Sequence, residues 1–364
     1  MPASHLRLPN GGCVRDERMH VLFSIHELGR NGAATALLAQ VRFLAAAGHQ
    51  ITVITPHSRP PLLEHFEQAG ARVTDQTNWR DHDVAVGCTV FAAPVMQKLL
   101  GRLPLVWWFH EGLAGLQYLH QTTAADHLLA AVDRLVFPSV ALVERIYRPV
   151  LHCVPPGRVE VIPNLVRQPG GIIPADKRAG RVRVLCVGTL CPRKRQGDLV
   201  EALLTLSRPD VECVFIGEAI DLDGATLDRM RSAAGQFHLP GALSPEQVHG
   251  YYRSADLLCL PSSDEAFALA PLEAASHGVP VVLSDLDAYH SVWRHGFDAL
   301  LHPVGDVELL AWSLRMLIES TTLHRRLSQA GRAVAARFTE ARCCVPFETM
   351  LREAIGGRRL GYGA

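Results

Sequence analysis

The chain has 364 residues, more than a single hydrophobic core usually supports, so two domains are expected. Hydrophobic residues make up 48% and charged residues 20% of the sequence, a balance that excludes an intrinsically disordered protein. The formal net charge is zero, which argues against a general nucleic-acid-binding protein.

Nine cysteines are scattered through apolar segments such as VLCVG and VECVFIG. They predict buried free thiols in a reducing compartment rather than a disulfide framework. Residues 1–18 contain no long apolar core, so no signal peptide is expected. The longest apolar runs fall far short of the ~20 residues that a membrane-spanning helix needs. We therefore expect a cytoplasmic protein, and peripheral contact with the inner face of a membrane stays open.

The N-terminal half predicts parallel strands joined by helices. A strand, a loop, a helix and a second strand are predicted at residues 19–25, 26–34, 35–47 and 51–55. This order is typical of a parallel α/β unit. The loop has only Gly29 and Gly32, so the dinucleotide fingerprint G-x-G-x-x-G is absent. Gly32 either allows a ligand to approach the backbone closely or is a plain turn glycine.

Further elements of this half are predicted at residues 84–87, 105–109, 135–138 and 159–163 (strands) and 140–147 (a helix). His110 directly follows a strand, at the edge of the sheet where α/β proteins bind ligands. A lone histidine is more often structural than functional, but this position favours a functional role. Glu111 beside it is explained equally well as a solvated loop carboxylate. The Gly- and Pro-rich stretch after VIPN (161–164) predicts a linker between two domains.

The C-terminal half predicts a second unit of the same kind. Its strands are expected at residues 182–187, 211–217, 257–260, 279–284 and 299–302, with helices from about 306 onward. The loop after the first of these strands contains Arg193, Lys194 and Arg195. Cations between a strand end and a helix are suited to neutralise a diphosphate leaving group. A solvated loop would explain any one of the three equally well.

Two carboxylates frame the loop that follows the strand at 257–260. Glu265 lies in the loop, and Glu273 is expected in the first turn of a helix that Pro271 opens and Gly278 ends. A helix N-terminus attracts anions such as a diphosphate, and carboxylates accept hydrogen bonds from sugar and ribose hydroxyls. Taken alone, the pair is more simply explained as a helix-dipole partner and a solvated loop residue.

Two segments, PSSDEAFALAPLEAASHGVPVV (261–282) and VLCVGTLCPRKRQGDLVEAL (184–203), resemble the donor half of retaining nucleotide-sugar glycosyltransferases of the GT-B fold, family 4. The resemblance runs from about residue 19 to about 338. It implies two doubly wound, Rossmann-like α/β domains that face each other across a cleft. The acceptor domain would span 1–166 and the donor domain 167–364, with the last helices (about 340–356) packing back on the first domain.

The resemblance also implies an activity. The enzyme would move a sugar, with retention of configuration, from a UDP- or GDP-linked donor to a saccharide, lipid-linked or small-molecule acceptor, as in polysaccharide biosynthesis. It implies no cofactor and no metal, and nucleic acid is not an expected partner. Two kinds of rival stay open: a catalytically impaired nucleotide-sugar-binding protein of this fold, and another enzyme such as a nucleotide-sugar epimerase or a phosphorylase.

Carried onto this sequence, the family pattern implies catalytic roles for Glu265, His110 and Lys194. It implies donor binding by Glu273, Arg193, Arg195, Gly188, Phe267, Ala268, Leu269 and Gly32. Leu239 and Pro240 would contact the nucleobase of the donor. Three positions depart from the pattern: Ala266 and Ala268 replace glycines on either side of Phe267, and Thr189 replaces an arginine. Whether these changes reduce or retune activity stays open.

Overall fold

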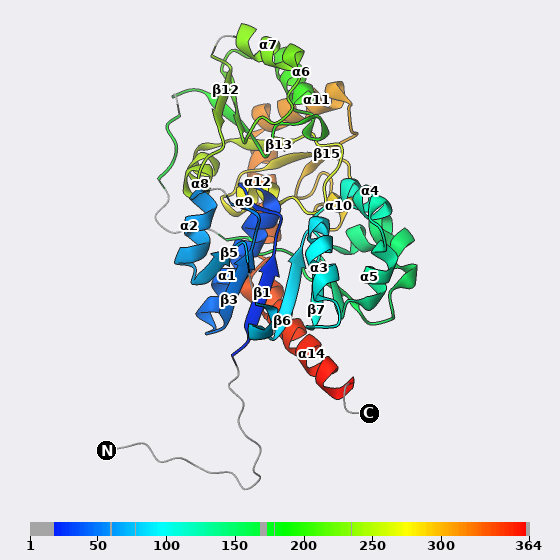
Figure 1. Cartoon of the computed structure of the whole chain (residues 1–364). Helices are drawn as coiled ribbons and strands as arrows, with labels where there is room; N and C mark the ends of the chain where they lie inside the picture. Colours follow the sequence, from blue (N-terminus) through cyan, green and yellow to red (C-terminus); the bar gives the residue numbers. More distant parts are fainter. Residues whose placement is uncertain are drawn as a thin grey trace, which may run out of the picture.

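The computed structural model describes residues 18–58, 60–76, 78–167, 173–177, 179–233 and 235–361. It contains two α/β units, one above the other in Figure 1, each with a parallel sheet flanked by helices. The strand orders are β5-β3-β1-β6-β7-β8-β9 in the first unit and β12-β11-β10-β13-β14-β15 in the second. Both sheets therefore start near their centre and wind outward in two directions, as predicted for doubly wound domains.

The strands of the first sheet are β1 (His20–Ser24), β3 (Gln50–Ile54), β5 (Ala71–Thr74), β6 (Val84–Cys88), β7 (Leu105–Trp108), β8 (Arg134–Phe137) and β9 (Val159–Val161). A small extra sheet pairs β2 (Glu27–Leu28) with β4 (His57–Ser58). The central strands β6 and β7 are buried along their whole length, as expected for a parallel sheet covered on both faces. The edge strand β5 was not predicted, because its sequence ARVT is short and only partly apolar.

The α-helices of this unit are α1 (Gly32–Ala46), α2 (Pro60–Gln68), α3 (Ala93–Leu99), α4 (Leu113–Gln121) and α5 (Ala125–Ala131). Its 3-10 helices are η1 (Trp79–Asp81), η2 (Val90–Ala92) and η4 (Arg148–Cys153), and η3 (Leu142–Tyr147) is a π-helix within the helix predicted at 140–147. α1 begins earlier than predicted because the Asn31 side chain accepts a hydrogen bond from the N–H of Ala34. Gly32 is therefore the first helical residue and not part of the loop.

The second sheet contains β10 (Val182–Val187), β11 (Val211–Ile216), β12 (Phe237–Gly241), β13 (Leu257–Leu260), β14 (Val281–Ser284) and β15 (Leu300–His302). Its helices are η5 (Pro192–Lys194), α6 (Gln196–Leu206), α7 (Gly224–Ser232), α8 (Pro245–Ser254), α9 (Leu269–Ser276), α10 (Asp287–His290), α11 (Val307–Glu319), α12 (Thr321–Ala335), α13 (Glu340–Cys343) and α14 (Val345–Gly361). β10 and β13 have the predicted bounds.

The start of α9 differs from the prediction. The helix begins at Leu269, with Ala268 as its N-cap, so Pro271 lies inside the first turn rather than opening it. Proline is tolerated there because the first N–H groups of a helix have no partner within it. Glu273 consequently lies in the second turn. Gly278 follows the helix with φ +82°, the left-handed conformation expected of a glycine that ends a helix.

The last helix returns to the first unit. Phe347, Met350 and Leu351 of α14 are buried in the same apolar cluster as the core of the first sheet, and Figure 1 shows α14 crossing beside β6. The side-chain amide of Gln40 in α1 also donates a hydrogen bond to the carbonyl of Cys343, at 3.0 Å. Both units are therefore held together by the C-terminal segment.

The cysteines within the described ranges are free thiols, and six of them are buried. Across the same ranges, no helix combines the length and apolar character needed to cross a membrane.

Candidate functional site

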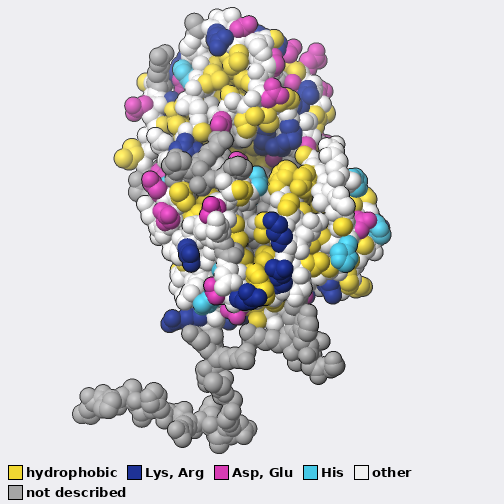
Figure 2. All heavy atoms as spheres, viewed as in Figure 1, with side chains coloured by type: hydrophobic (Ala, Val, Ile, Leu, Met, Phe, Trp, Pro, Cys, Tyr) yellow, Lys and Arg dark blue, Asp and Glu magenta, His cyan; other side chains and the backbone are white. Residues whose placement is uncertain are grey.

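A cavity of about 460 Å³ lies between the two units. The first unit contributes the N-terminus of α1 and the loops after β1, β6 and β7, and the second contributes the loops after β10 and β13. All of these loops follow the carboxyl ends of parallel strands, where α/β sheets bind ligands. Figure 2 shows the molecule hollowed at this level, with Lys or Arg side chains above the hollow and hydrophobic side chains beside it.

The structure brings ten of the predicted site residues together around this cavity: Gly32, His110, Gly188, Arg193, Lys194, Glu265, Phe267, Ala268, Leu269 and Glu273. Arg195 is not among the lining residues, because its guanidinium is turned to Asp198, with Nε 2.7 Å from Oδ2. Leu239 and Pro240 line a separate hollow of the second unit. Ala242 and Leu243 of the same segment line the cavity instead.

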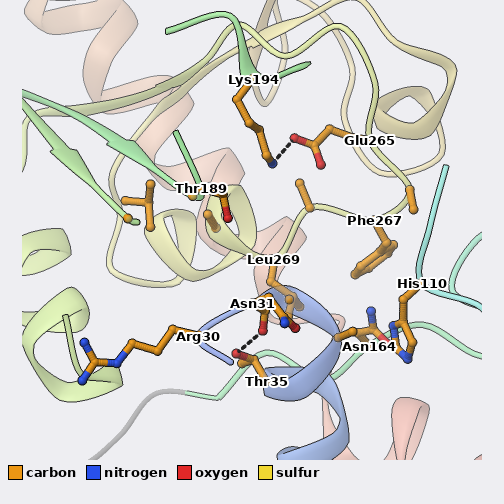
Figure 3. A pocket seen from close by; sticks show the side chains of 18 of the residues that line it. Arg30, Asn31, Thr35, His110, Asn164, Thr189, Lys194, Glu265, Phe267 and Leu269 are labelled. Atoms are coloured by element: carbon orange, nitrogen blue, oxygen red, sulfur yellow. Dashed lines mark hydrogen bonds and ion pairs between the residues drawn. The ribbon is translucent and has the colours of Figure 1, made fainter. Parts of the chain in front are cut away.

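Glu265 is the centre of a buried polar cluster. Its side chain is 7% exposed and forms an ion pair with Lys194, and the hydroxyl of Ser262 donates a hydrogen bond to Oε1 at 2.7 Å. Arg193 lies 3.6 Å from Oε2. Burial alone would raise the pKa of Glu265, but the charges of Lys194 and Arg193 and the two hydrogen bonds hold the pKa below its ordinary value. Figure 3 shows Lys194 and Glu265 joined at the upper side of the cavity.

In this cluster two cations, Lys194 and Arg193, face the carboxylate of Glu265, and the carboxyl of Asp264 interacts with both cations as well. The cluster stands close to the N-terminus of α9, whose N-cap Ala268 makes no side-chain cap. The first N–H groups of that helix are therefore left for another acceptor. Cations together with such N–H groups form a site suited to an anion such as a diphosphate.

Two glycines bring backbone close to this anion site. Gly188 has φ +143° and Gly217 has φ +154°, a conformation that L side chains rarely adopt. A Cβ atom on Gly217 would lie 2.1 Å from the carbonyl oxygen of Gly188. The loops after β10 and β11 can therefore touch only because Gly217 has no side chain. From the sequence, Gly188 was predicted to bind the donor, whereas Gly217, the first residue of GEA, was predicted only to end a strand where the family's nucleoside approaches.

Glu273 also lines the cavity, one turn into α9. The hydroxyl of Tyr252 in α8 donates a hydrogen bond to its Oε2 at 3.1 Å. Burial raises the pKa of Glu273 to about 7, against the smaller opposing effect of that hydrogen bond. The carboxyl is therefore neither a solvated residue nor a first-turn partner of the helix dipole. It is an acceptor that Tyr252 holds at one wall of the cavity.

The pKa of Glu273 predicts a pH dependence of stability. Because its pKa is raised to about 7 from 4.5, the folded state keeps a proton that the unfolded state releases, so stability is lost as the pH rises through 7. Going from pH 5 to pH 8 should therefore lower the free energy of unfolding of the natural protein, relative to Glu273→Gln, by about 2–3 kcal/mol. Urea denaturation at both pH values checks this, and an equal pH response of the two proteins would contradict it.

His110 and Asn164 provide two unsatisfied polar atoms at the cavity. Nε2 of His110 and Oδ1 of Asn164 are buried and have no hydrogen-bond partner among the described residues. Burial lowers the pKa of His110 to about 3, so the imidazole is neutral, and its ring lies 4.3 Å from that of Trp108. Both side chains lie on the same side of the cavity, below Phe267 in Figure 3. Such atoms are suited to bind ligand hydroxyls. From the sequence, Asn164 was predicted only to lie at the end of the first domain.

Glu111 is not the solvated loop carboxylate that one interpretation expected. Its Oε2 accepts hydrogen bonds from the backbone N–H groups of Val90 at 3.1 Å and His110 at 3.2 Å. Burial raises its pKa to about 7 despite these bonds. Glu111 therefore ties the loop after β6 to the loop after β7 at the wall of the cavity.

The loop between β13 and α9 in the second unit docks onto the first unit. Ala266 is buried in the apolar cluster that contains Trp107 and Phe109, and Leu269 is buried in the cluster that contains Phe347. Neither Ala266 nor Ala268 has a positive φ, so alanine fits this loop without backbone strain. The methyl groups that replace two family glycines therefore leave the loop intact, and Ala266 adds a contact between the units.

Asp264 of the same loop lies against the N-terminus of α4. Its Oδ1 accepts from the N–H of Leu113 at 3.4 Å, and a Cβ atom on Gly112 would lie 2.4 Å from that oxygen. Thr189, at the place of the family arginine, lines the cavity as well. No group of three or more His, Cys, Asp or Glu side chains suited to a metal ion occurs in the described part of the chain.

Solved structures with the same architecture define the class of the fold. Anabaena HepE, solved in complex with UDP-glucose, has a TM-score of 0.75 and 18% identity over 93% of this chain and 100% of that one. Sucrose-phosphate synthase from Thermosynechococcus elongatus has a TM-score of 0.74 and 17% identity, also over 93% and 100%. The chain therefore has the GT-B fold, as predicted.

Sequence comparisons place the second unit within a family. Residues 174–334 match the family described as glycosyl transferases group 1. A phosphatidyl-myo-inositol mannosyltransferase of Mycobacterium leprae is 32% identical over 40% of this chain and 40% of its own length. That of Mycolicibacterium smegmatis is 26% identical over 80% and 82%. The second unit thus belongs to the group 1 glycosyl transferases, which confirms the resemblance, while the chain spans less than half the length of the relative with the higher identity.

Proposed function

We propose that the protein is a retaining glycosyltransferase that uses a nucleoside-diphosphate sugar, UDP- or GDP-linked. The buried cluster of Glu265, Lys194 and Arg193 beside the uncapped N-terminus of α9 carries this proposal. It offers a carboxylate for sugar hydroxyls next to cations and N–H groups for a diphosphate. The solved relative that holds UDP-glucose, and the mannosyltransferase relatives, support the same class of reaction.

In the proposed reaction an acceptor hydroxyl attacks the anomeric carbon from the face that the diphosphate leaves. A new carbon–oxygen bond forms, the bond to the diphosphate breaks, and the leaving phosphate oxygen takes the proton of the acceptor. Lys194 and Arg193 stabilise the charge that grows on the phosphate. Glu265, His110 and Asn164 bind sugar hydroxyls, and Glu273 binds the ribose. No carboxylate is needed as a nucleophile, in contrast to retaining glycosidases.

The test is donor-dependent release of UDP or GDP from a panel of nucleotide sugars. Release that depends on an added acceptor supports transfer. Tight binding of a nucleotide sugar without release under any acceptor would favour the catalytically impaired alternative. Absence of binding to every UDP- and GDP-sugar would contradict the proposal.

Replacing Glu273 by alanine should weaken nucleotide binding at least tenfold. A hydrogen bond to a charged group contributes roughly 1.5–3 kcal/mol, and Glu273 lies on the wall assigned to the ribose. Calorimetric titration with UDP and GDP measures the change. Glu308→Ala is the matched control, because Glu308 is exposed on α11, away from the cavity. Equal affinities for the two variants would remove Glu273 from the site.

A further inference from the structure

Glu111 is the one carboxylate that the first unit contributes to the cavity, within the described part of the chain. The other carboxylates that line the cavity, those of Asp264, Glu265 and Glu273, belong to the loop after β13 and to α9 of the second unit. The proposed reaction uses Glu265 and Glu273 for the donor and leaves Glu111 without a role. Glu111 therefore faces a ligand that the first unit binds.

One oxygen of Glu111 is fixed and the other is available. Oε2 accepts hydrogen bonds from the backbone N–H groups of Val90 and His110, at 3.1 and 3.2 Å. Oε1 accepts none from another described residue, and it is not among the fully buried polar atoms that lack a partner. Because Glu111 lines the cavity, Oε1 is open to a ligand there. A carboxylate oxygen of this kind accepts hydrogen bonds from hydroxyl groups.

The surrounding backbone holds Glu111 in place. The hydroxyl of Tyr147 donates a hydrogen bond to the carbonyl of Glu111 at 3.0 Å. Helix α4 packs against both residues at Gly115, where a Cβ atom would lie 2.3 Å from the hydroxyl of Tyr147 and 2.6 Å from Cβ of Glu111. A carboxylate that is already fixed orients a bound hydroxyl with little further loss of side-chain entropy.

The loop after β6 is strained where it approaches Glu111. Thr89 has φ +77°, a conformation that a β-branched residue rarely adopts. Its N–H donates to the carbonyl of Trp108 at 2.9 Å, and its Oγ1 lies 3.2 Å from Nδ1 of His26, which also lines the cavity. The next N–H group, that of Val90, is one of the two that Glu111 accepts. Backbone strain that several contacts maintain is typical of binding sites.

No cation accompanies Glu111 among the described residues that set its pKa. Burial raises that pKa to about 7, and only backbone hydrogen bonds oppose it. Arg30, the arginine that the first unit contributes to the cavity, donates to the carbonyl of Ala242 in the second unit. The cations beside Glu265 also lie in the second unit. The wall at Glu111 is therefore suited to uncharged hydroxyls rather than to a phosphate.

We propose that Glu111 binds the acceptor, and that the end of the acceptor in the cavity is a neutral polyol. Oε1 accepts a hydrogen bond from a hydroxyl next to the one that attacks, and the proton of the attacking hydroxyl goes to the leaving phosphate as before. This inference rests on the proposed transferase function. It narrows the acceptor from any saccharide or small molecule to one whose reacting end carries several hydroxyls and no charge.

Glu111→Gln tests the proposal without removing the two backbone bonds. The amide oxygen can still accept from Val90 and His110, while an NH2 group replaces Oε1 and donates instead of accepting. The probes are glucose, mannose, myo-inositol and glycerol, each compared with its monophosphate, together with the nucleotide sugar that gives the most release of UDP or GDP.

At least one neutral probe should accept the sugar, with a lower KM than its monophosphate. In Glu111→Gln the KM for that probe should rise at least tenfold, because a hydrogen bond to a charged group is lost. The affinity for UDP or GDP, measured by calorimetric titration, should stay the same. An unchanged acceptor KM, a rise in the donor KM in its place, or a monophosphate used as well as its neutral counterpart would overturn the inference.

The matched control is Glu144→Gln, because Glu144 is an exposed glutamate of η3 in the same unit. Its acceptor KM and nucleotide affinity should equal those of the natural protein. Urea denaturation shows whether Glu111→Gln is folded. If it is not, Glu111→Asp, which keeps the charge on a side chain one methylene shorter, takes its place, and its acceptor KM should be at least threefold above the natural value.

The natural protein separates this inference from the proposed function. If it binds neither UDP nor GDP, the transferase function fails and the inference fails with it. If it binds a nucleotide and transfers sugar to none of the neutral probes, the inference alone is overturned.

Discussion

Lys194→Ala should destabilise the free protein by about 3 kcal/mol and abolish most of its donor turnover. The side chain of Glu265 is 7% exposed and that of Lys194 13% exposed, so the variant leaves a buried carboxylate without its nearest cation. Removing one partner of a buried ion pair costs about 3–5 kcal/mol. The lower value is expected because Arg193, at 3.6 Å, and Ser262, at 2.7 Å, still face the carboxylate. Urea denaturation and assays of nucleoside diphosphate release measure the two effects.

Lys98→Ala is the control for this variant, because Lys98 is an exposed lysine of α3. Its free energy of unfolding should stay within about 0.5 kcal/mol of the natural protein. Lys194→Ala/Glu265→Gln should be more stable than Lys194→Ala alone, since it removes the unpaired charge. If Lys194→Ala were as stable and active as Lys98→Ala, the buried pair and the phosphate assignment would both be wrong.

Lys194→Ala should also reverse the direction in which Glu265 makes the stability of the protein depend on pH. In the natural protein the pKa of Glu265 is held below its ordinary value, so its stabilisation is present at neutral pH and is lost as the pH falls through that lowered pKa. Without Lys194, burial dominates and the pKa rises. The variant should then regain stability, relative to the natural protein, as the pH falls from neutral toward 5.

Gly217→Ala should cost about 3 kcal/mol or more and weaken donor binding at least tenfold. The added methyl would lie 2.1 Å from the carbonyl oxygen of Gly188. That oxygen belongs to the backbone and cannot rotate away as a side chain would, so the loop after β10 must shift. The φ of +154° adds strain for any residue with a Cβ atom. Because Gly188 and Lys194 share this loop, the shift should reach the anion site. Thermal or urea denaturation and titration with UDP measure the two effects.

Gly224→Ala provides the comparison, since a Cβ atom there would meet nothing within 4 Å and Gly224 opens α7. This variant should be as stable as the natural protein, or more stable by about 0.5 kcal/mol. A Gly217→Ala protein with the same stability and nucleotide affinity would show that the loops after β10 and β11 do not touch closely.

Local patterns account for most of the correctly predicted elements. A continuous apolar run predicted the bounds of β13, because a strand buried on both faces is apolar at almost every position. β10 follows the same rule except at Arg183, which is buried and paired with Glu212 at 2.6 Å. The same criterion missed β5 and β12, whose sequences ARVT and FHLPG are only partly apolar. These are edge strands, and pairing with a buried neighbour defines them more than their own composition does.

Some site residues could likewise be predicted from the sequence, and others could not. Glu265, Lys194 and Glu273 could be named from the sequence because each belongs to a recognisable segment at a strand end. Arg195 could not be separated from Arg193 in the same way, since a left-handed backbone with φ +49° turns its side chain to Asp198. The residue types of PRKRQ (192–196) do not predict that backbone conformation.

By itself the sequence determined the alternation of strands and helices and the segment 261–282 that follows β13, because both depend on contiguous residues. The doubly wound class was implied by the family resemblance, and the strand orders of the two sheets bear it out. Only the tertiary structure decided which polar atoms meet in the cavity. Asn164 and His110 lie far apart in the chain, and Glu111 and Glu273 have raised pKa values only because neighbours from other elements bury them. The burial of these groups and the distances between them depend on how the two units pack against each other. No local pattern of residue types encodes that packing.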